Sequence, residues 1–188
     1  MAGGKLAPWI PTPVEVIRVA LRLAWVGPGD VLYDLGCGDG RVVVIAARDF
    51  GVRLAVGVEI DSLLAEAARY HARRCGVSGR VRIVEEDFRR VSLAPATVVY
   101  LYLYPSINEA LRPKLEAELR PGSRVVTIDF PVPGWVPVRM RRVEDSRGIT
   151  RTVRVYMVGL SDYRWRRPGS EVCGVPEAYS VLLGRGGS

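Results

Sequence analysis

The segment from Val31 to Arg41, which reads VLYDLGCGDGR, constrains the fold of this chain more than any other segment. It begins with a short apolar run, continues through three glycines in five positions, and leads into a second apolar run of helical length. Glycine lets a backbone turn sharply and approach a ligand closely. A buried strand that passes through such a turn into a helix is typical of Rossmann-like sheets, in which parallel strands alternate with helices.

Two aspartates distinguish this loop from one that holds a pyrophosphate. Asp34 lies two residues before Gly36, and Asp39 lies between Gly38 and Gly40. Dinucleotide-binding folds hold pyrophosphate with such a loop at a helix N-terminus, and two carboxylates would repel it there. They suit a ligand that has cationic groups and no phosphate. S-adenosylmethionine, with its sulfonium and its ammonium, is such a ligand.

A third acid indicates that the ligand carries a ribose. Residues 54–59 form an apolar run that ends in Glu59, about 20 residues after the loop, where an acid can accept hydrogen bonds from both ribose hydroxyls. The alternative is that Glu59 only caps the helix that begins at Asp61. We favour the ribose contact, and we expect Ile60 to line the same site.

The whole chain alternates strand-like and helix-like segments, and its 188 residues are enough for one core. The pattern predicts an α/β fold: a seven-stranded, mostly parallel Rossmann-like sheet with an antiparallel last strand and helices on both faces. We expect a domain over 1–161 and an irregular tail over 162–188. Strands are expected at 31–35, 54–59, 81–87, 97–103, 124–130, 135–143 and 149–160.

Helices are expected at about 13–26, 40–50 and 61–74, with a further helix after Pro105. The first is expected to begin in a capping box over residues 12–15. Pro113 should kink or split the last. Helix 61–74 is expected to turn four apolar residues inward: Leu63, Leu64, Ala67 and Ala68.

Ligands of open α/β sheets bind outside the carboxyl ends of the strands, so the residues that follow each strand are candidates for ligand contacts. Asp87 and Phe88 follow the third strand and suit an adenine. The carboxylate can accept a hydrogen bond from the exocyclic amine while the aromatic ring covers the base. The alternative is a strand-end acid followed by a core aromatic residue.

The ends of the fourth and fifth strands are where a methyl acceptor should enter. Tyr100, Tyr102 and Tyr104 alternate and therefore project to one face, and an aromatic face near the strand end can hold an ammonium. Asn108, the single Asn of the chain, can orient an amine, and Asp129 is a weaker candidate for that role. Sheet packing of the tyrosines and an ordinary first-turn position for Asn108 are the alternatives.

Composition narrows the class of protein further. The net charge of +7 permits an acidic partner, either nucleic acid or an acidic protein surface. No apolar run reaches the length of a membrane span. The cysteines at 37, 75 and 173 form no metal-type pair, so we expect no metal and a reducing cytoplasm. The absence of Gln fits a thermophile, although a GC-rich genome would also explain the abundant Arg.

These residues resemble the class I S-adenosylmethionine-dependent methyltransferases. The segments VLYDLGCGDGR, VGVEID, EEDF, ATVVYLYL and PGWVPV are similar to the archaeal protein-lysine methyltransferases and to the mitochondrial enzymes that modify the adenine nucleotide translocase and the ATP synthase c subunit. The resemblance covers about residues 8–160. One departure is Ile128, which stands where the archaeal group usually carries a His.

The resemblance implies methyl transfer from S-adenosylmethionine to lysine side chains of proteins, with a broad substrate range. It places Asp34, Gly36, Gly38 and Gly40 at the methionine end of the cofactor, Glu59 at the ribose, Asp87 and Phe88 at the adenine, and Pro11 and Thr12 over the cofactor. The alternative is an RNA or small-molecule methyltransferase, which the Arg-rich segments 139–154 and 164–167 favour. The oligomeric state is unknown from sequence.

Overall fold

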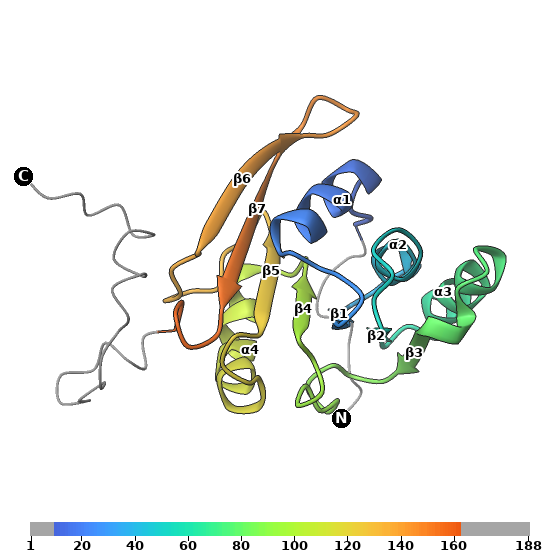
Figure 1. The fold of residues 1–188 in the computed structure, drawn as a ribbon, viewed down its shortest axis with the longest axis horizontal. Coiled ribbons are helices and arrows are strands. Elements are labelled where there is room, and N and C mark those ends of the chain that lie inside the picture. Colours follow the sequence, from blue (N-terminus) through green and yellow to red (C-terminus); the bar gives the residue numbers. More distant parts are fainter. Residues whose placement is uncertain (1–9, 163–188) are drawn as a thin grey trace, which may run out of the picture.

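One seven-stranded sheet organises the chain, of which the computed structural model describes residues 10–162. The strand order is β3-β2-β1-β4-β5-β7-β6 (Figure 1). Only β7 runs antiparallel to its neighbours, β5 and β6, which confirms the predicted mixed sheet. The strands are β1 (Val31–Leu35), β2 (Leu54–Glu59), β3 (Val81–Glu85), β4 (Val98–Leu101), β5 (Arg124–Ile128), β6 (Arg139–Glu144) and β7 (Thr150–Met157).

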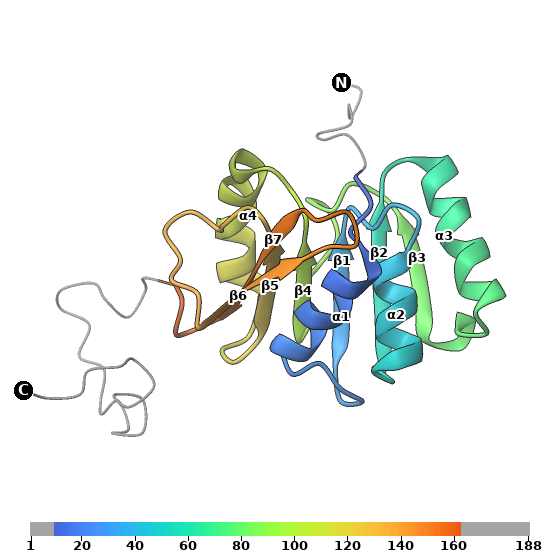
Figure 2. The same ribbon diagram turned by 90° about the horizontal axis from the view of Figure 1, so that it is seen from above.

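Helices cover both faces of this sheet, as predicted (Figure 2). The first face is packed against α1 (Val14–Leu23) and α2 (Arg41–Asp49), and the second against α4 (Pro105–Glu118). On the second face the connections 86–97 and 129–138 complete the core with Leu93 and Trp135. The helix α3 (Ser62–Arg74) packs beside α2 and β3, and a 3-10 turn, Ser78–Arg80, follows it.

Several strands end earlier than their sequence pattern predicted. The third, fourth and fifth stop at Glu85, Leu101 and Ile128, each two residues short of the predicted end. The polar and aromatic residues beyond these ends therefore belong to loops. At the fifth strand the cause is visible, because Asp129 has a φ of +59° and cannot continue a ladder.

The predicted start of the first helix was wrong. Pro13 occupies the N-cap, and no side chain caps the helix. Glu15 instead accepts a hydrogen bond from the backbone N–H of Ser146, at 2.7 Å. The helix also ends at Leu23, short of the predicted residue 26. The last helix is continuous from 105 to 118, so Pro113 does not split it.

The inward face of α3 also differs from the prediction. Leu63 is 82% exposed and Ala67 is exposed, whereas Ala65, Ala68 and Ala72 are buried. The reason is close packing: a Cβ at Gly40 would lie 2.8 Å from the Cβ of Ala68. Only small side chains fit between α3 and the start of α2, so the helix turns its alanine stripe inward.

Candidate functional site

The glycine-rich loop after β1 is folded tightly against the end of β2. The backbone N–H groups of Gly36 and Cys37 donate to the carbonyl of Val58, at 2.8 and 3.0 Å. Gly36, Gly38 and Gly40 have φ values of +83°, +54° and +75°, which only glycine adopts readily. The loop therefore needs its glycines for conformation, as the sequence predicted.

Asp34 places a buried carboxyl under this loop. Asp34 is only 4% exposed to solvent. Burial raises the pKa of Asp34 well above its usual range, and the nearby carboxylates of Glu59 and Asp39 raise it further. No basic side chain of the described residues offsets this effect. A cationic ligand would supply the missing positive charge, so the site fits the sulfonium and ammonium of S-adenosylmethionine.

Glu59 links the glycine-rich loop to the segment that follows β2. One carboxylate oxygen accepts the N–H of Gly38 at 2.9 Å, and the other accepts those of Ile60 and Asp61 at 2.9 and 3.0 Å. The alternative role predicted for Glu59, capping the next helix, belongs instead to Asp61, which accepts from the N–H groups of Leu63 and Leu64. Glu59 thus stays at the rim, where its ribose contact is a prediction.

Arg41 connects the loop to the segment that precedes α1. Its guanidinium pairs with Asp39 at 2.8 Å and donates to the carbonyl of Thr12 at 3.1 Å. This bond places Thr12, and with it Pro11, beside the cofactor loop. Sequence reasoning did not include Arg41 among the site residues, although its position directly after the last glycine was a signal.

The predicted adenine side lies at the end of β3. Both carboxylate oxygens of Asp87 accept from the Nε of Arg89, at 3.0 and 2.9 Å, and hydrogen bonding to Arg89 lowers the pKa of Asp87. An adenine amine would therefore share this carboxylate with Arg89. Phe88 packs partly against the core, and Ile60 is exposed on the same rim. Their adenine contacts stay predictions.

Three polar groups meet at the predicted acceptor end. The hydroxyl of Tyr102 donates to Asp129 at 3.1 Å, and Arg151 donates to Tyr102 at 3.1 Å and to Asp129 at 2.9 Å. The N–H of Phe130 bonds the carbonyl of Ile128, which closes a γ-turn centred on Asp129. Arg151 was missed because its position depends on the pairing of β5 with β7, which the sequence did not define.

Aromatic rings lie next to this polar cluster. The ring of Phe130 is stacked 6.4 Å from that of Tyr102 and tilted at 5.6 Å from that of Tyr104. Tyr104 is partly exposed, whereas Tyr100 is buried in the core on the helix α1 side. The packing alternative therefore holds for Tyr100, and the other two tyrosines lie at the rim.

Asn108 is fully buried in the first turn of α4. Its side-chain nitrogen faces the carbonyl oxygens of Leu103, Phe130 and Pro131, at 3.3, 3.4 and 3.1 Å. The amide thus holds the loop after β4 against the loop after β5. Asn108 thus stabilises the two loops that form the acceptor end, and a direct contact between Asn108 and an amine stays a prediction.

The site contains acids and aromatic rings but no metal-binding arrangement. Within residues 10–162, no group of three or more His, Cys, Asp or Glu side chains is placed to hold a metal ion. The same part of the chain contains no helix with the length and hydrophobicity of a membrane span. Cys37 is buried and burial raises the pKa of its thiol, so it is a packing residue and not a nucleophile.

The mixed sheet, the glycine loop and the acids at the strand ends define a class I S-adenosylmethionine-dependent methyltransferase. The chain belongs to the ANTKMT methyltransferase family, because residues 34–139 match the model of the ANTKMT methyltransferase domain. It is 45% identical over 152 residues to a protein-lysine N-methyltransferase of Saccharolobus islandicus, a match that covers 81% of this chain and 94% of the relative.

Two further relatives differ in the acceptor that their names give. The adenine nucleotide translocase lysine N-methyltransferase of Mus musculus is 36% identical, over 95% of this chain and 75% of its own length. A crystal structure of an RNA methyltransferase from Salinibacter ruber, in complex with S-adenosyl-L-homocysteine, is 44% identical, with a TM-score of 0.73. That match covers 79% of this chain and 94% of the solved one.

Proposed function

We propose that this protein transfers the methyl group of S-adenosylmethionine to the side-chain amine of lysine residues in proteins. The observation that carries the proposal is the acceptor end, where the contacting rings of Tyr102, Phe130 and Tyr104 lie next to a carboxylate, Asp129, that already has a cationic partner. Two relatives whose names specify lysine, at 45% and 36% identity, support the same acceptor.

The acceptor end suits an amine that must react without its proton. The sulfonium of the cofactor supplies an activated methyl group, so the chain's own residues need to position and desolvate the acceptor. Aromatic surroundings disfavour the charged form of an amine and lower its pKa. The ring faces of Tyr102 and Tyr104 also attract the arriving ammonium by ~1–2 kcal/mol, which offsets part of this loss of hydration while the substrate binds.

Asp129 has a limited role in this scheme. One of its oxygens accepts from both Tyr102 and Arg151, and the other accepts from the backbone N–H of Thr152 at 3.0 Å. A carboxylate with these donors is a poor general base, but its remaining lone pair can orient an amine. Asn108 holds the loop that carries Phe130, and we propose that it positions the acceptor end in this indirect way.

Methylation of RNA is the second candidate, because the Salinibacter ruber structure is described as an RNA methyltransferase. Exposed arginines on β6, Arg139, Arg141 and Arg142, are the basic surface that an RNA would use. They lie on the edge strand, one strand beyond β7, whereas the aromatic cluster lies at the ends of β4 and β5. Only β7 lies between these arginines and the acceptor end, so the choice of acceptor rests on the two relatives whose names specify lysine.

We also propose that the protein works in a reducing cytoplasm and comes from an archaeal thermophile. The free thiols of Cys37 and Cys75 support the first point. The lack of Gln, the single Asn and the similarity to the Saccharolobus islandicus enzyme support the second.

The test is to incubate the purified full chain with methyl-labelled S-adenosylmethionine and a protein fraction of cells. A parallel reaction contains an RNA fraction of the same cells in place of the protein fraction. Mass spectrometry of the protein fraction should find methyl groups on lysine, and D34N should remove the label. Label found only in RNA would overturn the proposal.

A further inference from the structure

The side chain of Arg151 connects the acceptor end to the hairpin between β6 and β7. Arg151 lies on β7 and its side chain is 14% exposed, with Asp129 on one side of the guanidinium at 2.9 Å and Asp145 on the other at 3.2 Å. The side chain of Asp145 is fully buried, and that of Asp129 is 21% exposed. Asp145 also accepts the N–H groups of Arg147 and Ile149, so it is fixed in the hairpin.

This arrangement holds Arg151 in one orientation. Asp145 takes the Nε side of the guanidinium, which aims the other end at Asp129 and Tyr102. The backbone of Asp129 is fixed as well, because its N–H donates to the carbonyl of Thr152 and its own carbonyl accepts from Arg154. The charge of Arg151 therefore stands at a defined place beside the predicted amine site.

The electrostatic consequence concerns the amine itself. A carboxylate near an amine favours the protonated form and raises the amine's pKa, whereas a cation has the opposite effect. An uncompensated Asp129 would therefore hold a lysine ammonium and keep it unreactive. When a cation offsets the charge of Asp129, desolvation by the aromatic rings becomes the main effect on the pKa of the amine. Desolvation favours the neutral amine.

We propose that Arg151 is a positioning residue that offsets the charge of Asp129, so that an acceptor lysine loses its proton at the site. This inference rests on the proposed lysine acceptor. Arg151 acts through Asp129, since it does not itself need to touch the methyl group or the amine nitrogen.

Other titratable or charged side chains lie around Asp129, on the elements that are packed against it. They are Tyr102 after β4, Arg154 on β7, and Arg147 with Asp145 in the hairpin. The phenol of Tyr102 stays protonated, because burial and the neighbouring Asp129 raise its pKa. Arg147 pairs with Asp145 at 3.6 Å and is more exposed than Arg151, so solvent screens it more. Arg154 donates to the backbone carbonyl of Asp129, whereas Arg151 pairs with its carboxylate, so Arg151 is the cation that offsets the carboxylate charge most directly.

The test compares R151Q, which removes the charge, with R151K, which keeps it. The wild-type enzyme is first assayed on a lysine peptide across pH, with kcat and KM determined separately. For R151Q, the acidic limb of kcat should move up by about one pH unit, which is about a tenfold loss near neutral pH that is recovered in alkali. R151K should keep the wild-type limb, and KM for S-adenosylmethionine should not change in either variant.

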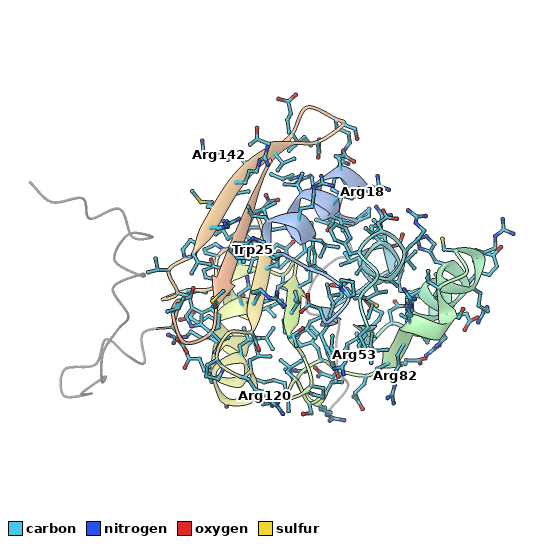
Figure 3. The ribbon with its side chains drawn as sticks, viewed as in Figure 1. Arg18, Trp25, Arg53, Arg82, Arg120 and Arg142 are labelled. Carbon is cyan, nitrogen blue, oxygen red and sulfur yellow. The ribbon has the colours of Figure 1, made fainter. Side chains whose placement is uncertain are left out.

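A double variant and a control separate positioning from simple destabilisation. In R151Q/D129N the limb should return toward the wild-type position, because the charge that Arg151 offsets is gone. The control is R53M, at an exposed position just before β2 (Figure 3), which should keep the wild-type limb. If R151Q does not fold, D129N alone should move the limb to lower pH.

The outcomes distinguish this inference from the function on which it rests. A wild-type enzyme that leaves lysine unmodified would overturn the proposed function. An active wild type whose R151Q variant loses activity equally at every pH, with no shifted limb, would overturn the role of Arg151 and leave the function intact.

Discussion

At the scale of single residues, the strongest functional constraint is the buried carboxyl of Asp34. Its pKa is raised well above the usual range by burial, by Glu59 and by Asp39. A folded-state pKa above the unfolded value means that the folded protein binds this proton more tightly. The group therefore favours folding at low pH, and this contribution is lost as pH rises through the folded pKa. Without a cation, the ionised form destabilises the fold.

D34N should therefore stabilise the protein without ligand and remove binding of S-adenosylmethionine. At about pH 8 we expect a melting temperature higher by about 2–4 °C, the change that ~1 kcal/mol gives in a domain of this size, with the difference vanishing toward pH 4. Thermal unfolding across pH and calorimetry with the cofactor measure both effects.

The matched control is D49N at the far end of α2. Asp49 has its pKa lowered, chiefly by the hydrogen bond from Arg48, so its charge contributes stability at neutral pH that is lost as pH falls. D49N should therefore leave the melting temperature equal or lower, and leave cofactor affinity unchanged. Lower stability of D34N at about pH 8, or retained affinity, would contradict the assignment of Asp34.

Gly40 is needed for both conformation and space. Its φ is +75°, and an added Cβ would lie 2.8 Å from the Cβ of Ala68. G40A should cost about 2–4 kcal/mol in the free energy of unfolding, from the left-handed conformation and from overpacking together. G122A is the matched control, because Gly122 has a φ of +87° with nothing within 4 Å; it should cost about 1–2 kcal/mol. Urea unfolding of the two variants would contradict this account if they lost equal stability.

At the scale of elements, the start of α1 joins the two ends of the site. Arg41 on α2 holds the carbonyl of Thr12 just before the helix, and Glu15 in its first turn accepts the N–H of Ser146 from the hairpin between β6 and β7. The cofactor loop and the hairpin that carries Asp145 thus contact the same short stretch of chain. This stretch connects the donor and acceptor ends of the site.

R41A should loosen the segment before α1 and weaken cofactor binding. Loss of a charge-assisted hydrogen bond is worth about 1.5–3 kcal/mol, so we expect Kd for S-adenosylmethionine to rise by about tenfold or more, with an unchanged fold. The control is R48A in the last turn of the same helix, where the side chain pairs with Asp49. Calorimetry that found equal affinities for R41A and R48A would show that the Thr12 contact does not matter for the cofactor.

How far the sequence could predict these elements depends on whether the information is local. The strand–loop–helix unit around Asp34 and the position of Glu59 follow from apolar runs and glycine spacing, which are local. The role of Arg151 depends on the register that pairs Ile128 with Val153, and the inward face of α3 depends on how closely Ala68 approaches Gly40. Such contacts form only when distant segments pack, so no local pattern indicates them.

At the scale of the whole molecule, the positive charge gathers in part on an edge of the sheet. Within the described residues 10–162, β6 pairs with β7 alone and exposes Arg139, Arg141 and Arg142. The guanidinium of Arg139 lies 3.7 Å from the ring of Trp25, which is exposed at the end of the helix layer (Figure 3). Charged side chains on an edge strand prevent it from pairing with another chain. We interpret these arginines as protection of the edge and not as an acceptor site.

This interpretation makes a prediction that separates solubility from catalysis. R141T/R142T places β-favouring side chains on the exposed edge, so light scattering should show stronger self-association than in the wild type, while kcat on a short lysine peptide stays within about twofold. R141K/R142K keeps the charge and should behave as the wild type in both measurements. A loss of about tenfold or more in kcat/KM for R141T/R142T, without self-association, would contradict this interpretation. The arginines of β6 would then form part of a substrate-binding surface.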